Sequence, residues 1–363
     1  MKAYSILLTA ALAGACSSSG FGPINIESGT PPELLSELNL IAAVDGALVT
    51  NARVEPYTLN TPLFSDYAVK DRHIYVPEGQ AGAFDPRWTY AFPEGSAILK
   101  TFSVAPDLRE PDQNLRRVET RVLLFTEEGW TAWPYLWNEE GTDAELKLSG
   151  KIKPMQVIDR DGNERSFSYL VPQRNQCQEC HEIEDEEENK YIVPIGPSAR
   201  NLDDGTQLQR LEDLGVLEPA PAERARPVVN WSEYVDADFS TLDDQTLDVV
   251  ARDYLDVNCA HCHNDRAVNG QTSQLFLAWD NTDLFRVGLC KKPGSAAKGT
   301  GGRSYDIVPG NPDQSILHYR MQTDDVGSMM PDIGRSLVHD EGVALIREWI
   351  ARMPADDCVG NEE

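Results

Sequence analysis

The sequence predicts an α+β multidomain fold, in which a β-rich N-terminal domain precedes an all-α C-terminal domain. Strand-like alternation and turn residues run through the first half, and helical periodicity begins after residue 240. A stretch that contains Pro219, Pro221 and Pro227 separates the two patterns. The expected segments are 36–217 for the β-rich domain, 218–239 for a linker and 240–363 for the helical domain. A chain of 363 residues with 41% hydrophobic content is long enough for two cores.

The beginning of the chain resembles a bacterial lipoprotein signal. Lys2 precedes a short apolar run, small residues follow, and the cleavage region ends on Cys16, which would become the lipidated N-terminus. An ordinary signal peptide cut nearby is the alternative. We expect residues 1–15 to be the lipoprotein signal peptide and 16–35 a flexible Ser/Gly/Pro-rich tether. The protein is therefore expected to be exported and to face the periplasm, with Ser17 favouring the outer membrane of a Gram-negative bacterium and the lipid as the only membrane contact.

The β-rich half is predicted from paired strand signals. Two hairpins are expected, one across Glu127-Glu128-Gly129 and one across Asp161-Gly162, because short apolar and β-branched runs flank these turn residues. Together the strands favour a sandwich or a small barrel. The expected strands cover residues 73–76, 98–104, 118–126, 130–138, 155–159 and 167–171.

The helical half is predicted from two apolar stripes. The first leads into Cys259 and the second ends at Pro354, and both repeat every three to four residues. A short helix is also expected over 208–217, where Gly215 ends it. The stripes comprise Leu247, Val250, Ala251, Tyr254 and Leu255, and then Val343, Ile346, Trp349, Ile350 and Met353.

The order Cys-x-x-Cys-His occurs twice and is the attachment signature of c-type haem. In the first motif Cys177 and Cys180 precede His181, and in the second Cys259 and Cys262 precede His263. The cysteines would bind the porphyrin covalently and each histidine would ligate the iron. A four-cysteine zinc site is disfavoured, because its pairs normally lie about 15–20 residues apart and need no following histidine. A thioredoxin-like motif would need a βαβ setting. The sequence thus predicts two covalently bound haem c groups.

The second axial ligand of each iron is less marked in the sequence. For the second haem we expect Met330, which precedes Pro331, with Met329 or no methionine as alternatives. For the first haem Met155 is the main candidate and His73 the second, and an open sixth position is the third possibility. An open position would allow a small ligand to bind.

Two cysteines lie outside the signal region and the two motifs, and the chain as a whole is strongly acidic. Cys290 and Cys358 are left over and are expected to form a disulfide in an oxidising compartment, with two free buried thiols as the alternative. The formal net charge of −27 disfavours nucleic acid and favours redox partners with basic docking patches. The acidic run 182–188 follows the first motif and is expected to be a solvated loop that lowers the potential of the first haem.

Characteristic residues follow the second motif at 309–312, Ser315, 320–321, 330–331 and 349–350. With these residues and its second haem, the C-terminal domain resembles a class I cytochrome c. A second set lies in the rest of the chain, at 63–68, Lys70, 92–95, 100–102, 119–121, 137–138, 142–144, 194–197 and 199–202. Together they resemble, over nearly the whole mature chain, a family of bacterial dihaem c-type cytochromes, often lipoproteins, whose β-rich half carries the first haem. The resemblance implies transfer of single electrons between periplasmic redox partners rather than catalysis. The alternative is a dihaem redox enzyme, similar to a peroxidase or oxidase, with an open sixth site on the first haem.

Overall fold

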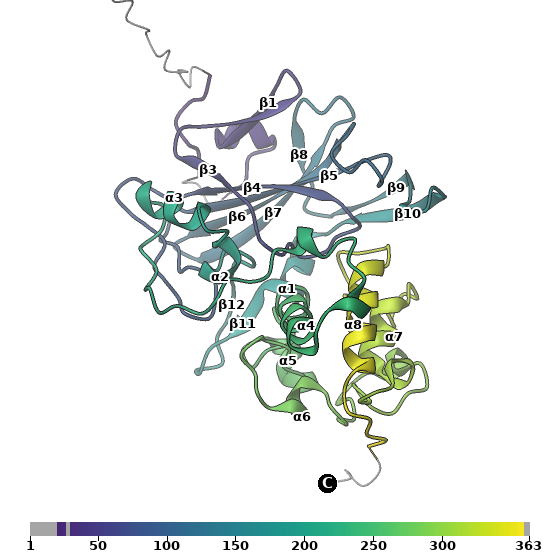
Figure 1. The fold of residues 1–363 in the computed structure, drawn as a ribbon. Coiled ribbons are helices and arrows are strands. Elements are labelled where there is room, and N and C mark those ends of the chain that lie inside the picture. The colour runs from purple at the N-terminus through teal and green to yellow at the C-terminus, as the bar shows by residue number, and fades with distance from the viewer. Residues whose placement is uncertain (1–19, 27–29, 359–363) are drawn as a thin grey trace, which may run out of the picture.

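The computed structural model describes residues 20–26 and 30–358. A six-stranded antiparallel sheet dominates the N-terminal half, and its strands follow one another in chain order (Figure 1). Each strand therefore pairs with the next strand along the chain, but the connections differ in length: a two-residue turn joins β6 to β7, whereas residues 76–96 join β4 to β5. The strands are β3 (Val54–Tyr57), β4 (Val69–Tyr75), β5 (Ala97–Val104), β6 (Arg116–Thr126), β7 (Gly129–Trp137) and β8 (Ala144–Leu146).

The two faces of this sheet have different partners, because successive side chains of a strand point to opposite faces. Leu99 and Val122 belong to the face that packs against the N-terminal segment, which contains the 3₁₀ helix η1 (Leu35–Leu38) and the hairpin of β1 (Ile41–Val44) and β2 (Ala47–Thr50). Ile98 and Leu123 belong to the opposite face and pack with α2 (Ala199–Leu202) and α3 (Gln207–Asp213). This second face also borders a cavity.

Both expected hairpins are confirmed. Strands β6 and β7 pair across Glu127 and Glu128, and β9 (Lys151–Ile158) pairs with β10 (Glu164–Val171). The prediction of a sandwich or barrel is wrong, because the remaining strands of the described chain pair only two by two. These are β1 with β2, β9 with β10, and β11 (Glu182–Glu184) with β12 (Lys190–Ile192). Helices and loops, rather than a second sheet, cover the face of the six-stranded sheet that contains Ile98 and Leu123.

The C-terminal half is built around two longer helices, α4 (Asp244–Asn258) and α8 (Asp340–Ala351). Their apolar stripes are buried together, as the periodicity predicted: Leu247, Val250 and Leu255 of α4 lie in one core with Leu345 and Ile350 of α8. The Asp243 side chain caps α4 by accepting from the Thr246 amide at 2.9 Å. The helices between them are α5 (Val268–Ser273), α6 (Leu284–Val287) and α7 (Ile316–Gln322).

The predicted all-α class I cytochrome c domain over residues 240–363 is wrong. Among the described residues, every α-helix other than α4 and α8 has seven residues or fewer, and the six-stranded β-sheet is the largest regular structure. Between α4 and α8 the chain forms brief helices and irregular loops, two of them closed by isolated bridges, Leu289 with Ile307 and Tyr305 with Ser315. Glycine and proline recur through this stretch and prevent longer helices. Two amphipathic stripes were therefore too little to predict the domain architecture.

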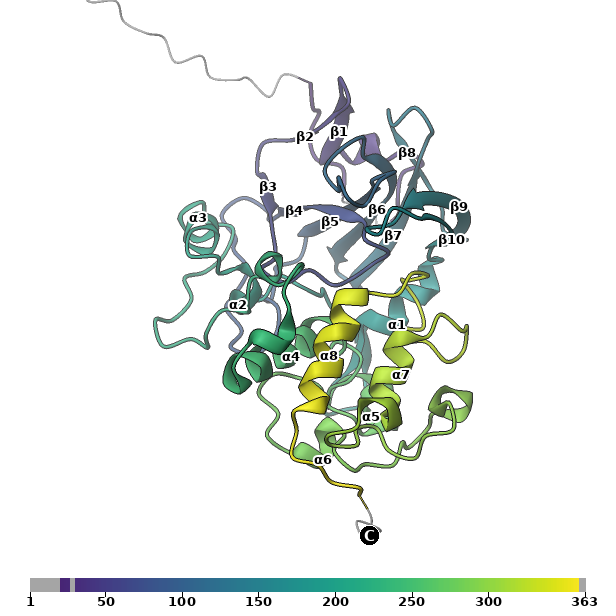
Figure 2. The same cartoon turned by 45° about the vertical axis from the view of Figure 1, so that its right-hand side comes forward.

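The two halves pack directly against each other, with the sheet on one side and helices α4–α8 on the other (Figures 1 and 2). Residues 218–239, expected as a linker, lie at this junction, and Val228, Trp231 and Phe239 are buried. The Trp231 amide donates to the Asn60 carbonyl at 2.8 Å. The Phe64 amide donates to the Asn258 side chain at 2.8 Å, which ties the N-terminal half to the end of α4.

No helix of the described residues combines the length and the apolar character that a membrane span requires. The expected signal peptide, residues 1–15, and the expected lipid anchor Cys16 lie outside the described residues.

Candidate functional site

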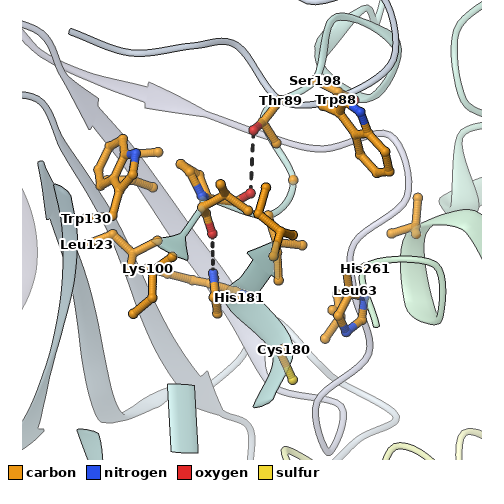
Figure 3. Close-up of a pocket in the computed structure, with 18 of the residues that line it drawn as sticks. Leu63, Trp88, Thr89, Lys100, Leu123, Trp130, Cys180, His181, Ser198 and His261 are labelled. Atoms are coloured by element: carbon orange, nitrogen blue, oxygen red, sulfur yellow. Dashed lines mark hydrogen bonds between the residues drawn. The ribbon is translucent and has the colours of Figure 1, made fainter. Parts of the chain in front are cut away.

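The first Cys-x-x-Cys-His motif lies in the junction between the two halves. Cys177 ends the 3₁₀ helix η2 (Arg174–Cys177), and the single turn α1 (Gln178–His181) carries Cys180 and His181. Because this turn brings positions i, i+3 and i+4 to one side, all three side chains border the same cavity, of about 510 Å³. Figure 3 shows Lys100 and Leu123 on the sheet side of His181, with Leu63 and His261 on the other side.

The His181 ring is held in one tautomer. Its Nδ1 lies 2.7 Å from the Val193 carbonyl oxygen, which can only accept, so Nδ1 carries the hydrogen (Figure 3). In return the Val193 amide donates to the His181 carbonyl at 2.9 Å. Burial lowers the pKa of His181 to about 4, so the ring is neutral at pH 7. Its Nε2 lone pair is therefore free to bind a metal.

The second motif directly follows α4. The helix ends at Asn258, one residue before the motif, but the helical spacing continues because the His263 amide donates to the Cys259 carbonyl at 2.9 Å. Cys259, Cys262 and His263 all border a second cavity, of about 270 Å³. The spacing expected from a helix is thus produced by a hydrogen-bonded turn at its end.

His263 matches His181 in its electronic state. Its Nδ1 lies 3.3 Å from the Ser273 hydroxyl, which itself donates to the Gly270 carbonyl at 3.2 Å. The hydroxyl therefore accepts from Nδ1, which again leaves Nε2 with the lone pair. Burial, the main cause, lowers the pKa of His263 to about 4. Both motifs thus present a neutral imidazole with a fixed tautomer beside two cysteines.

The two motifs touch each other. The Cys262 thiol donates to the Glu179 carbonyl of the first motif at 3.3 Å. Cys180 and His261 border both cavities. The Cys180 and Cys262 sulfurs and one His261 ring nitrogen lie within 4.8 Å of one another. The Nδ1 atom of His261 is buried and has no hydrogen-bond partner in the described structure. The cavities therefore share a wall built from the motifs themselves.

Among the methionines expected near the second motif, Met330 borders the second cavity and Met329 does not. Two hydrogen bonds fix the Met330 backbone: its amide donates to the Arg320 carbonyl at 2.8 Å, and Arg335 Nε donates to its carbonyl at 3.0 Å. Met321 also borders this cavity. The structure therefore brings Met330, the expected second ligand, into the same cavity as His263.

The candidates for the first motif are placed differently. Met155 lies on β9 and packs with the cluster that contains Phe102 and Tyr169, and it does not border either cavity. His73 is buried on β4, on the face opposite the first cavity, and does not border it either. Lys100 of β5 borders the first cavity, where burial and then neighbouring cations lower its pKa well below the usual value. The sequence analysis did not single out Lys100, although a lysine in an otherwise apolar strand was a visible signal.

Further cations surround the first cavity. Arg72 and Arg121 border it from the sheet, and Arg87 and Arg266 border it from loops. The two loop arginines lie against the Trp88 ring, with guanidinium carbons 4.7 and 5.2 Å from its centre. The prediction of a solvated loop over 182–188 is confirmed for Glu186, Glu187 and Glu188, which are exposed, but it is wrong for Glu182–Glu184, which form β11. Five arginine and lysine side chains and two carboxylates, Asp85 and Asp256, thus border the cavity, so basic groups outnumber acidic ones there although the protein as a whole is strongly acidic.

Cys290 and Cys358 form a disulfide, with Cα atoms 5.1 Å apart. The bridge joins the loop after α6 to the segment after α8 and does not border either cavity. The cysteines of the two motifs are the free thiols of the described chain.

No family model, curated protein or solved structure matches this chain. Its function therefore has to be argued from the two cavities.

Proposed function

We propose that this protein is an exported dihaem c-type cytochrome that transfers single electrons between periplasmic redox partners. The observation that carries the proposal is a pair of adjoining cavities, each bordered by both cysteines and the histidine of one motif. Cys177 and Cys180 would hold one haem, and Cys259 and Cys262 the other. When bound, haem supplies a centre that accepts and releases one electron.

The described residues fit such a group in three ways. Both imidazoles are neutral, and each has its Nδ1 engaged, so that His181 and His263 present Nε2 as a ligand. The first cavity lies within the range of about 300–1,000 Å³ that is usual for cofactor sites, and the second lies slightly below it. Met330 is available in the second cavity as a sulfur ligand, which would raise the potential there.

The chain's own residues set the environment for electron exchange. The contact between Cys262 and Glu179 brings the two attachment segments together without an intervening layer of side chains. The net charge of −27 supports partners with basic docking patches. The lipoprotein-like signal supports export, and the resemblance to bacterial dihaem cytochromes supports electron transfer.

Covalent haem is tested by the intact mass of the mature protein produced with a haem-attachment system. The mass should exceed that of the processed apoprotein by two haem groups. A variant with Cys177→Ser and Cys180→Ser should lose one group, and a variant with Cys259→Ser and Cys262→Ser should lose the other. One group or none in the unaltered protein would overturn the proposal.

A rival interpretation is a metal ion held directly by Cys180, His261 and Cys262, whose ligand atoms lie close together. It would leave Cys177, Cys259 and the two neutral histidines of the motifs without a role. His261→Ala separates the two interpretations. The haem proposal predicts that this variant keeps both covalent groups, whereas the rival predicts stoichiometric zinc in the native protein and its loss in the variant.

A second candidate function is a dihaem redox enzyme with an open sixth position at the first iron. It is favoured by one observation, that neither Met155 nor His73 borders the first cavity. Carbon monoxide binding to the reduced protein decides between the functions. A carrier with both irons fully ligated should not bind it. An enzyme should bind one equivalent, and Met330→Ala should then add a second.

A further inference from the structure

Three basic residues form a row across the sheet and face the first cavity. Arg72 on β4 lies directly opposite Lys100 on β5, and Lys100 lies directly opposite Arg121 on β6. All three border the cavity that contains Cys177, Cys180 and His181. We call Arg72, Lys100 and Arg121 the cation row.

This arrangement is unfavourable unless a negative group completes it. Like charges on directly opposite strand positions repel each other. In the row only Arg121 has a carboxylate partner, Glu119, whose oxygens lie 2.6 and 2.9 Å from its guanidinium nitrogens. Lys100 has no ion pair or hydrogen bond with any described residue, and its Nζ lies 5.1 Å from the centre of the Phe102 ring. The row thus contains three basic groups and only one carboxylate partner.

Arg72 gives the second, independent observation. Its side chain is buried, with 7% of the residue exposed. Nη1 donates to the Lys70 carbonyl at 3.1 Å, but the buried Nη2 has no hydrogen-bond partner. An unsatisfied buried donor is costly, especially on a charged group. Arg72 therefore borders the cavity and also carries a buried donor without a partner among the described residues.

Three other buried cations of the described chain are paired or hydrogen-bonded. Arg200 contacts two carboxylates, at 2.7 and 3.0 Å. Lys291 pairs with Asp306 at 3.0 Å. Arg335 donates to several backbone carbonyls, including those of Met330 and Thr323. Arg72 and Lys100 differ from these three cations: both border the first cavity, and neither forms an ion pair with a described carboxylate.

We propose that the cation row binds the oxygen atoms of one anionic group, a carboxylate or a small oxyanion, inside the first cavity. Arginine guanidinium groups recognise such oxygens by paired hydrogen bonds, and lysine adds a point charge. The inference deepens the proposed function, on which it rests. The anionic oxygens have two available sources, a propionate of the haem held by Cys177 and Cys180, or a small anion that diffuses into the cavity.

The experiment compares holoprotein variants in which the covalent haem count is measured first. Lys100→Met and Arg72→Met remove one positive charge with little loss of side-chain volume. Lys151→Met, at an exposed position on β9, is the matched control. Lys100→Arg keeps the charge and should behave as the unaltered protein. Resonance Raman bands of haem propionates report the first source. Titration with sodium formate, balanced with sodium chloride and followed by the haem absorption, reports the second.

Either of two results supports the inference. A shift of a propionate band in Lys100→Met and Arg72→Met, absent in Lys151→Met, identifies the haem carboxylate. A saturable formate response in the unaltered protein that weakens at least tenfold in the two row variants identifies a diffusible anion. If every variant keeps two covalent haems and neither result is observed, the cation row is not a binding site. The proposed function is then unaffected. Absence of covalent haem overturns the proposed function instead.

Discussion

Replacing Arg200 with methionine removes the cation that joins the two halves, and we expect a loss of about 3 to 5 kcal/mol in the free energy of unfolding. Arg200 extends from α2 and contacts Asp253 at 2.7 Å and Asp256 at 3.0 Å, both on α4. Its guanidinium carbon also lies 4.0 Å from the centre of the Trp279 ring. Removing one partner of a buried ion pair leaves the other charge buried and less compensated, which is the source of this large penalty.

The structure indicates the lower end of that range and adds a dependence on pH. Asp253 keeps Arg226 at 2.6 Å and the Val229 amide at 3.0 Å, so one carboxylate stays largely satisfied. Asp256 depends more strongly on Arg200. Burial already raises the pKa of Asp256 to about 6, and Arg200 is the main group that opposes this rise. A carboxyl whose folded pKa is raised loses stability as pH increases through that value. The variant should therefore be most destabilised above about pH 6.

Urea unfolding of the holoprotein at pH 5 and pH 8, followed by circular dichroism, measures the effect. Arg347→Met is the matched control, because Arg347 pairs with Asp313 at 2.6 Å while both side chains are about half exposed or more. An exposed pair should contribute less than about 1 kcal/mol. If Arg200→Met is no more destabilising than this control at pH 8, the buried network does not stabilise the junction and the reasoning is refuted.

Three further predictions concern the cavities and the core beside them. Met330→Ala should lower the midpoint potential of the second haem in a redox titration, whereas Met329→Ala should leave it unchanged; equal potentials in both variants would contradict the ligand assignment. Ser273→Ala removes the acceptor of the His263 Nδ1 hydrogen bond, 3.3 Å away, and should raise that potential because the imidazole becomes less basic; an unchanged or lower value would argue against this role. Burial lowers the pKa of His339 to about 3, so its contribution to stability should be present above about pH 6.5 and decrease as the pH falls toward 3. In the His339→Phe variant, the free energy of unfolding should therefore depend less on pH between about 3 and 6.5 than in the unaltered protein. The same pH dependence in both proteins would refute this role of His339.

The sequence was informative where a structural signal is local. The hairpin of β6 and β7 follows from two apolar strands and the turn between them. The stripes of α4 and α8 follow from a repeat that one helix face must bury. The spacing within each Cys-x-x-Cys-His motif is also local, so the group of two cysteines and one histidine could be read directly.

The sequence was uninformative where distant segments meet. The contact between Glu179 and Cys262 depends on how the halves pack, and no pattern within either motif encodes it. The cation row depends on strand register, which places Arg72 and Arg121 on either side of Lys100. The all-α prediction failed for the same reason, since tertiary contacts rather than periodicity determine the loops between α4 and α8.

The shared wall of the two cavities has a consequence for how other molecules approach. Since Cys180 borders both cavities, a redox partner of the proposed haem groups that docked beside either cavity would approach the same central segment. One docking face is then sufficient for electrons to enter and leave in turn. A donor and an acceptor would compete for that face, and mixing them at equal concentration should slow turnover rather than speed it.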